Sequence, residues 1–328
     1  MLTVPSYGFE HQCKEIHDSW GQLNRLVLGL AMRTRLERQQ IRETYKAIYG
    51  EDLVKRLQDV ETSGISRNEA AGVSPKLCAA LPLWMLDMHE CDAVVAREAL
   101  QQDNTNYKAL VEIFVGRKSS HILLMKQEYQ ARFKRQLDQD IINIEPPNPY
   151  QKILVALVAS HKAHHLDVSN HIAKCDAKRL YETGEGSPGA IERGVVLEIL
   201  SKRSVPQLKL TFSSYKRIYG HDYTASLKRG DFREFENALG VVAKCIYKPP
   251  NYYAKTLYGS IKGITGDKAA IERVMVSRAE VDMDEIQRVY KKKYGIQLRD
   301  ALSLCENIPS TDYRDFLVAL ATKMNELC

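Results

Sequence analysis

Apolar and aromatic residues recur four times along the chain in the same order. Each copy begins with an arginine, has a tyrosine twelve residues later, and has a second aromatic ring four residues after that tyrosine. The arginines are Arg33, Arg117, Arg203 and Arg278, the tyrosines are Tyr45, Tyr129, Tyr215 and Tyr290, and the second rings are Tyr49, Phe133, Tyr219 and Tyr294. The arginines stand 84, 86 and 75 residues apart. This self-similarity predicts four repeats of one structural unit.

The spacing inside each copy is that of α-helices. Apolar residues lie seven and three residues before each arginine, and the two rings behind it are four residues apart, so each pair falls on one helix face. A glycine follows the second ring at Gly50, Gly220 and Gly295, as expected at a left-handed helix end. The second copy has Lys134 there, which predicts a different end for that helix.

Further helical segments flank each copy and complete about five helices per repeat, with almost no strand. They are predicted over residues 10–19, 78–86, 90–102, 150–160, 174–182, 233–247, 252–262 and 313–327. Polar or Pro/Gly-rich joints divide the chain into repeats over residues 9–88, 89–172, 173–249 and 250–328. A small-residue-rich stretch, 62–76, is predicted to be a surface loop inserted into the first repeat.

Composition narrows the class of protein. The chain has 328 residues, 44% of them hydrophobic, and 47 basic against 41 acidic side chains. A mild basic excess without a dense Lys/Arg block favours an anionic membrane surface over nucleic acid as a partner. The start of the chain lacks a secretory signal, and no apolar run reaches the length of a spanning helix. Seven cysteines without a CxxC pair indicate a reducing, intracellular compartment.

The four-fold repeat, with its R-x11-Y-x3-[YF] spacing and trailing Tyr-Gly, resembles the annexin family over essentially the whole chain. The segments IRETYKAIYGEDL, MKQEYQARFK and VMVSRAEVD resemble plant annexins in particular. The resemblance implies an all-α curved disc of four annexin repeats that binds acidic phospholipid membranes peripherally from the cytoplasm through calcium. It implies a stress-related role and leaves open self-association on membranes and a cytoskeletal partner. No enzymatic activity is expected, because the sequence shows no Ser-His-Asp or Cys-His arrangement at a family-specific spacing.

The resemblance also implies where calcium would bind. In the family, a G-x-G-T loop offers backbone carbonyls and an acid about forty residues later completes the site with its carboxylate, which suits an ion that takes six to eight oxygens. In repeat 1 the matching carbonyls are those of His17, Ser19 and Gly21, and Glu61 stands forty residues after Gly21. This loop departs from the pattern at Ser19 and at Gln22, which replaces the threonine.

A second, more degenerate calcium loop is expected in repeat 4. The matching carbonyls are those of Ile261, Gly263 and Thr265. Forty residues after Thr265 the chain has Cys305 instead of an acid, so the expected carboxylate is that of the neighbouring Glu306. Repeats 2 and 3 lack the loop pattern.

Two further groups of residues match family positions. Trp20, at the tip of the repeat 1 loop, is expected to anchor the protein at the headgroup level of a bilayer; packing against its own loop is the alternative. Asp92, Glu112, Arg117 and Arg273 match the hydrophilic centre between repeats. They could line an ion path, but a buried charge network that fixes the docking of repeats is the favoured interpretation.

Other activities have weaker support in the sequence. The clustered His161, His164, His165 and His171 are interpreted as a solvated helix end rather than a metal site. The stretch before Lys268 fails the phosphate-loop pattern, because Asp267 occupies the position of its glycine. The main alternative is therefore a calcium-independent lipid binder or scaffold with the same fold. A peroxidase-like or nucleotide-hydrolysing activity is the less favoured one.

Overall fold

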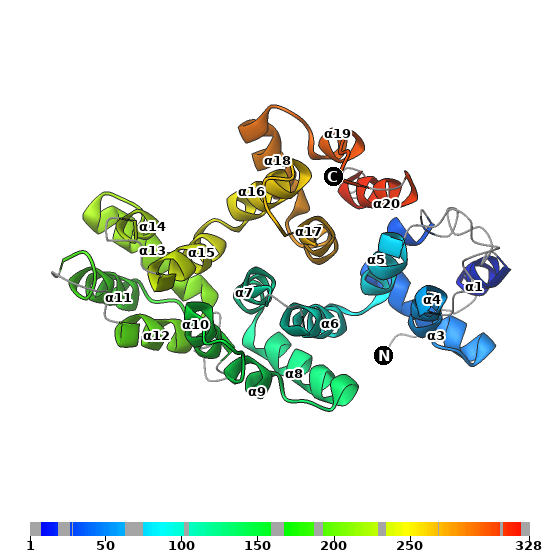
Figure 1. Ribbon diagram of the computed structural model, residues 1–328, viewed down its shortest axis with the longest axis horizontal. Coiled ribbons are helices and arrows are strands. Elements are labelled where there is room, and N and C mark those ends of the chain that lie inside the picture. Colours follow the sequence, from blue (N-terminus) through cyan, green and yellow to red (C-terminus); the bar gives the residue numbers. More distant parts are fainter. Residues whose placement is uncertain are drawn as a thin grey trace. The chain divides into compact units, whose positions relative to one another are not determined.

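The chain folds into α-helices, and the residues that the structure describes contain no strand (Figure 1). The computed structural model describes residues 8–18, 27, 29–62, 75–101, 105–158, 167–186, 193–228, 234–267, 269–308 and 311–322, with the backbone alone at 60–62, 75 and 311. The prediction of an all-α fold is confirmed. Within those residues no helix is both long enough and apolar enough to cross a bilayer.

The helices form two compact units. Unit 1 combines Met1–Cys91 with Tyr253–Cys328, and unit 2 is Asp92–Tyr252. Helices α6 (Met88–Gln101) and α16 (Pro249–Ile261) pass from one unit to the other. The predicted repeat boundaries stay a prediction.

The remaining helices divide between the units as follows. Unit 1 holds α1 (Glu10–Asp18), α3 (Arg35–Tyr49), α4 (Leu53–Thr62), α5 (Pro75–Met85), α17 (Ala270–Arg278), α18 (Met283–Tyr294), α19 (Leu298–Ser303) and α20 (Thr311–Thr322). Unit 2 holds α7 (Tyr107–Gly116), α8 (Ser119–Phe133), α9 (Leu137–Ile142), α10 (Pro149–Val158), α11 (Asn170–Glu182), α12 (Arg193–Lys202), α13 (Val205–Tyr219), α14 (Tyr223–Ser226) and α15 (Glu234–Tyr247).

The first tyrosine of each copy is a core residue. Tyr45, Tyr129, Tyr215 and Tyr290 are all 0% exposed. Burial raises the pKa of Tyr129, Tyr215 and Tyr290 to about 12. The hydrophobic spacing in the sequence therefore marked the packed face of the helix in every repeat.

The second ring of each copy lies at the end of its helix and packs against the end of the first helix of the same repeat. Ring stacks join Tyr49 to His17, Tyr219 to Tyr181 and Tyr294 to Tyr258, with centroids 3.9, 4.0 and 3.8 Å apart and planes within 8° of parallel. In repeat 2 the partner of Phe133 is the guanidinium of Arg97, whose Cζ lies 6.0 Å from the ring centroid. These contacts position the chain just before each inter-helix loop.

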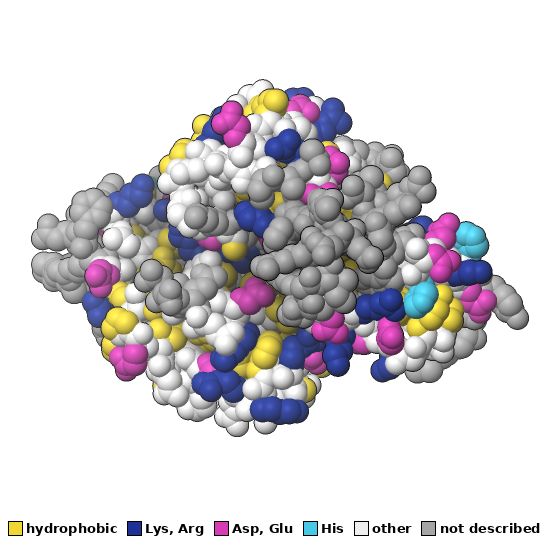
Figure 2. Space-filling model, turned by 45° about the vertical axis from the view of Figure 1, so that its right-hand side comes forward, with side chains coloured by type: hydrophobic (Ala, Val, Ile, Leu, Met, Phe, Trp, Pro, Cys, Tyr) yellow, Lys and Arg dark blue, Asp and Glu magenta, His cyan; other side chains and the backbone are white. Residues whose placement is uncertain are grey.

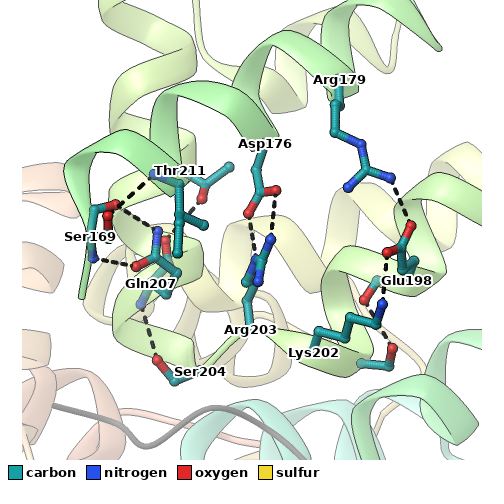
Figure 3. A network of polar contacts seen from close by, with 11 residues as sticks. Ser169, Asp176, Arg179, Glu198, Lys202, Arg203, Ser204, Gln207 and Thr211 are labelled. Atoms are coloured by element: carbon teal, nitrogen blue, oxygen red, sulfur yellow. Dashed lines mark hydrogen bonds and ion pairs between the residues drawn. The ribbon is translucent and has the colours of Figure 1, made fainter. Parts of the chain in front are cut away.

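The arginine that starts each copy meets a carboxylate in one of two ways. In unit 2 the acid comes from the helix before the one that precedes the arginine. Arg117 Nε donates to Asp92 of α6 at 2.6 Å, and Arg203 Nε donates to Asp176 of α11 at 2.7 Å, the latter pair drawn in Figure 3. In unit 1 the acid lies four residues later. Arg33 donates to Glu37 at 3.5 Å and Arg278 donates to Asp282 at 2.8 Å.

Left-handed caps end the helix after the second ring in all four copies. Gly50, Gly220 and Gly295 have φ of 70°, 80° and 77°. Lys134 adopts the same conformation with φ 56°, and its N–H donates to the Gln130 carbonyl at 3.0 Å. The prediction of a different helix end in repeat 2 was therefore wrong, because a non-glycine residue tolerates this geometry at a cost of roughly 1–2 kcal/mol.

Polar side chains also tie α11, α12 and α13 together (Figure 3). The amide of Gln207 on α13 accepts from the backbone N–H of Ser169 at 2.7 Å and donates to its carbonyl at 3.1 Å. On the neighbouring side, Glu198 accepts from Arg179 at 2.7 Å and from Lys202 at 2.9 Å. These bonds fix the start of α11 against α13 and the end of α11 against α12.

Candidate functional site

The repeat 4 loop follows the last turn of α16 and folds back over it. The backbone N–H groups of Ile264 and Thr265 both donate to the Gly259 carbonyl, at 2.8 and 3.2 Å. A Cβ added at Gly259 would lie 2.9 Å from the methyl group of Thr265, so the loop packs directly on a glycine. Gly263 has φ +65°, a conformation that L side chains rarely adopt. The loop thus has one fixed path.

The carbonyl of Ile261, the first expected calcium ligand in repeat 4, already accepts two hydrogen bonds. The Cys305 thiol donates to it at 3.4 Å, and Asn307 Nδ2 donates to it at 3.2 Å. Both donors come from the connection between α19 and α20, so the structure brings together the two segments that the calcium pattern pairs. The side-chain groups that reach the Ile261 carbonyl are a thiol and an amide, where the calcium pattern expects a carboxylate. Glu306, the expected carboxylate, is exposed between them.

The far side of the same loop is closed by an ion pair. Arg273 of α17 donates to Asp267 at 2.8 Å and 3.3 Å, and Ser260 Oγ donates to the Asp267 carbonyl at 3.0 Å. Arg273 is buried, and its assignment to one charge network with Asp92, Glu112 and Arg117 stays a prediction. Its partner Asp267 belongs to the loop itself, which the sequence pattern did not indicate.

In repeat 1 the structure describes the beginning of the expected calcium loop. The His17 ring stacks on Tyr49, and its Nδ1 lies 3.0 Å from the Tyr45 hydroxyl. Arg56 of α4 donates to the same hydroxyl at 3.0 Å and lies 3.4 Å from His17 Nδ1. The ends of α1 and α4 are thereby tied together. Glu61 follows Arg56 on α4, about 1.4 turns further along the helix.

The other repeat 1 candidates fall outside this description. Ser19, Trp20, Gly21 and Gln22 lie outside the described residues, and at Glu61 only the backbone is described, as part of α4. The repeat 1 site therefore stays a prediction. Of the four clustered histidines only His171 is described, and its Nε2 lies 3.6 Å from Cys175 Sγ.

The charged residues expected at the hydrophilic centre are each engaged by a partner. Asp92 and Arg117 form two hydrogen bonds, at 2.6 and 3.1 Å, and His121 donates to Asp92 at 2.7 Å. Burial opposes ionisation of Asp92, but the charge of Arg117 and the hydrogen bonds from His121 and Arg117 outweigh it, so the pKa of Asp92 is lowered. Glu112 accepts from the Tyr252 hydroxyl at 3.0 Å in the same unit.

The remaining member, Arg273, lies in the other unit, in the pair with Asp267 described above. Sequence reasoning missed His121. Its position in the first turn of α8, four residues after Arg117 in the sequence, was the available signal.

Charges of both signs mix on the surface. On the face drawn in Figure 2, basic and acidic side chains alternate across the described part, with hydrophobic side chains between them. Among the described residues on this face, neither sign of charge dominates.

Comparison with known proteins agrees with the repeat and with the fold. The family model described as Annexin matches residues 91–157 and 252–320. Annexin D2 of Arabidopsis thaliana is 31% identical over 316 residues, covering 95% of this chain and 94% of that protein. Annexin A4 of Mus musculus is 33% identical over 295 residues, covering 90% and 87%.

A solved structure entitled annexin III superposes with a TM-score of 0.81 at 28% sequence identity and covers 98% of this chain and 95% of that one. The relatives thus include plant and animal proteins matched over nearly their full length. The four-copy sequence pattern, the all-helical fold and these full-length similarities show that the chain belongs to the annexin family.

Proposed function

We propose that this annexin binds acidic phospholipid membranes peripherally and in a calcium-dependent manner, from the cytoplasm, through repeat 1. The carbonyls of His17, Ser19 and Gly21 and the carboxylate of Glu61 would hold the ion. Water and lipid phosphate would supply the remaining oxygens, since calcium takes six to eight. Trp20 would anchor the loop at the headgroup level.

The observation that carries this proposal is the tie between α1 and α4. Arg56 and His17 share the Tyr45 hydroxyl, at 3.0 Å from each, so the start of the loop lies beside the helix that carries Glu61. The donor set also fits the ion: three backbone carbonyls and one carboxylate are oxygen ligands of the kind that calcium prefers. Calcium, when bound, would bridge this loop to anionic headgroups.

The repeat 4 loop fits calcium less well. The ion would have to displace the two hydrogen bonds at the Ile261 carbonyl, and the side chain at the position of the carboxylate is the thiol of Cys305. We therefore assign calcium binding to repeat 1 and none to the Gly263, Thr265 and Glu306 set. No catalytic role is assigned to this chain.

Co-sedimentation with phosphatidylserine-containing vesicles, with calcium titrated against a chelator, tests the proposal. Glu61→Gln keeps the shape of the side chain and removes its charge, and we expect it to raise the calcium concentration needed for half-maximal binding at least about tenfold. Glu43→Gln, an exposed residue on α3, is the matched control and should bind like the parent protein. Unchanged calcium dependence in Glu61→Gln would exclude the assigned site.

One observation favours the calcium-independent alternative for part of the molecule. In the repeat 4 loop, Cys305 and Asn307 already donate to the Ile261 carbonyl and Arg273 pairs with Asp267, which favours a loop that contacts lipid without calcium. Vesicle binding that ignores calcium and disappears with salt would support that alternative for the whole protein, because salt screens surface charge.

A further inference from the structure

We propose that repeat 4 makes a second, metal-free contact with an acidic lipid surface through the exposed side chains of Ile264 and Leu304. This inference rests on the proposed membrane binding of repeat 1. In this inference the repeat 4 loops insert apolar side chains into the lipid surface. The hydrogen bonds from Cys305 and Asn307 to the Ile261 carbonyl, which we call the lock, take the place of calcium.

Ile264 and Leu304 are the most exposed large hydrophobic side chains among the described residues. Their exposed fractions are 70% and 73%, and the next is Leu36 with 62%. Single exposed aliphatic residues are common and need no explanation. These two, however, occupy two neighbouring loops, because Leu304 immediately precedes Cys305 and Ile264 stands three residues after Ile261. A hydrogen bond from Cys305 to the Ile261 carbonyl joins the two loops, and we call the exposed side chains of Ile264 and Leu304 the apolar tip of repeat 4.

The lock between the loops explains how the tip keeps its shape without an ion. Cys305 Sγ and Asn307 Nδ2 both donate to the Ile261 carbonyl, at 3.4 and 3.2 Å, and Cys305 is buried. A carbonyl oxygen has two lone pairs, so this ligand position is filled. Asp267 is held by Arg273 at 2.8 Å, which closes the other side of the loop.

Lysines next to the tip match an anionic surface. The stack of Tyr258 on Tyr294, with centroids 3.8 Å apart, places the last turn of α18 beside the last turn of α16, directly before the loop. That turn carries the exposed Lys291, Lys292 and Lys293. Lys262 in the loop is also exposed.

Acidic side chains around the tip are fewer. Glu306 is exposed, and Asp300 pairs with Arg299 at 3.4 Å. The described charges near the tip are therefore mainly basic, which favours anionic headgroups as the partner over a neutral protein surface. Apolar side chains surrounded by lysine are the combination that binds the interface of an acidic bilayer.

The test uses the full-length protein and vesicles of phosphatidylserine and phosphatidylcholine in chelator at low salt. Ile264→Gln/Leu304→Gln should lower the calcium-free partition coefficient about tenfold, because two aliphatic side chains no longer enter the bilayer. The matched control is Leu36→Gln/Val281→Gln, which changes two exposed side chains of the same unit, 62% and 46% exposed, and should leave binding unchanged. An unchanged thermal midpoint shows that each variant is folded.

A second variant, Lys291→Gln/Lys292→Gln/Lys293→Gln, should weaken calcium-free binding and reduce its dependence on salt. Equal binding of the tip variant and its control would overturn the inference. So would the absence of any calcium-free binding by the parent protein, or a tip variant that loses only self-association in solution.

The two proposals fail separately. The inference alone fails if the parent protein binds vesicles in calcium and not in chelator. The proposed function alone fails if calcium adds nothing to binding and Glu61→Gln is silent.

Discussion

Asp92 shows how strongly one residue of this fold depends on its neighbours. It is buried, it accepts two hydrogen bonds from Arg117, and it accepts a third from His121. A buried arginine that loses its carboxylate remains charged, because guanidinium does not deprotonate in proteins. Removing one partner is therefore expected to cost much more stability than the intact pair contributes.

We expect Asp92→Asn to lower the free energy of unfolding by about 3–5 kcal/mol, the usual cost of leaving one partner of a buried pair uncompensated. Urea denaturation followed by circular dichroism measures this. Glu198→Gln is the control: Glu198 also contacts two basic residues, but its side chain is 40% exposed, and its loss should cost under about 1 kcal/mol. Similar losses in the two variants would contradict the importance of burial.

The same substitution should have a pH signature. The pKa of Asp92 in the folded protein lies below its unfolded value of about 3.9, so its contribution to stability is present above that pH and is lost as pH falls through the folded pKa. The difference in unfolding free energy between the parent protein and Asp92→Asn should stay constant from about pH 5 to 7 and shrink below about pH 4. A constant difference at all pH values would mean that the carboxylate charge is not involved.

Single residues also show what could and could not be predicted. The four buried tyrosines followed from spacing alone, because helix periodicity places them on the core face. The helix end at Lys134 was predicted wrongly. Its backbone N–H donates to the Gln130 carbonyl four residues earlier, the same kind of cap bond that the glycines make in the other copies. The calcium pattern paired the segments of Ile261 and Cys305, but it specifies a carboxylate there and so did not predict the hydrogen bonds from Cys305 and Asn307.

At the scale of the element, the cap at the end of α8 stores a measurable strain. Lys134→Gly should raise the free energy of unfolding by about 1 kcal/mol, because glycine adopts the left-handed conformation without a Cβ penalty. Gly220→Ala is the reciprocal test and should lower it by a similar amount, since a Cβ there meets no atom within 4 Å and only the backbone conformation is strained. Thermal unfolding of both variants decides, and a stability loss in Lys134→Gly would contradict the reasoning.

The loop lock of repeat 4 can be converted into a metal-responsive element. Cys305→Asp should place a carboxylate beside the Ile261 carbonyl, where two oxygens repel each other until a cation lies between them. We expect a lower thermal midpoint in chelator and a rise with added calcium, because a ligand that binds only the folded state stabilises it. Cys305→Ser, which keeps a hydroxyl donor, should show no response to calcium. Identical calcium responses in the two variants would refute this interpretation.

At the scale of the whole molecule, unit 1 is built from both ends of the chain. Arg38 of α3 donates to Glu280 at 3.0 and 3.1 Å, 242 residues away, and its guanidinium carbon lies 3.6 Å from the centroid of the Trp84 ring. Helix α5 packs against α17 and α20. Sequence repetition predicted four similar modules, but it could not show which modules share a core, because that depends on contacts between repeats.

This arrangement predicts different behaviour for fragments. Residues 92–252 form a unit with its own internal contacts and should fold alone with a cooperative thermal transition. Residues 1–91 should not, because the apolar face of α5 would lose α17 and α20 and expose its core side chains to water. Circular dichroism melts of the two fragments measure the difference. A cooperative transition in residues 1–91 would show that repeat 1 needs no partner from the C-terminal part.

The environment of Trp84 has an optical consequence. The chain has two tryptophans, Trp20 and Trp84, both in the first predicted repeat. Trp84 is buried under Arg38, and its indole N–H donates to the Leu30 carbonyl at 3.0 Å, so its fluorescence should be a constant, blue-shifted background. Any change of emission on adding calcium or lipid would then come from Trp20. Intrinsic tryptophan fluorescence can therefore report on the repeat 1 loop. The repeat 4 loops contain no tryptophan, so lipid binding there should not change the emission directly.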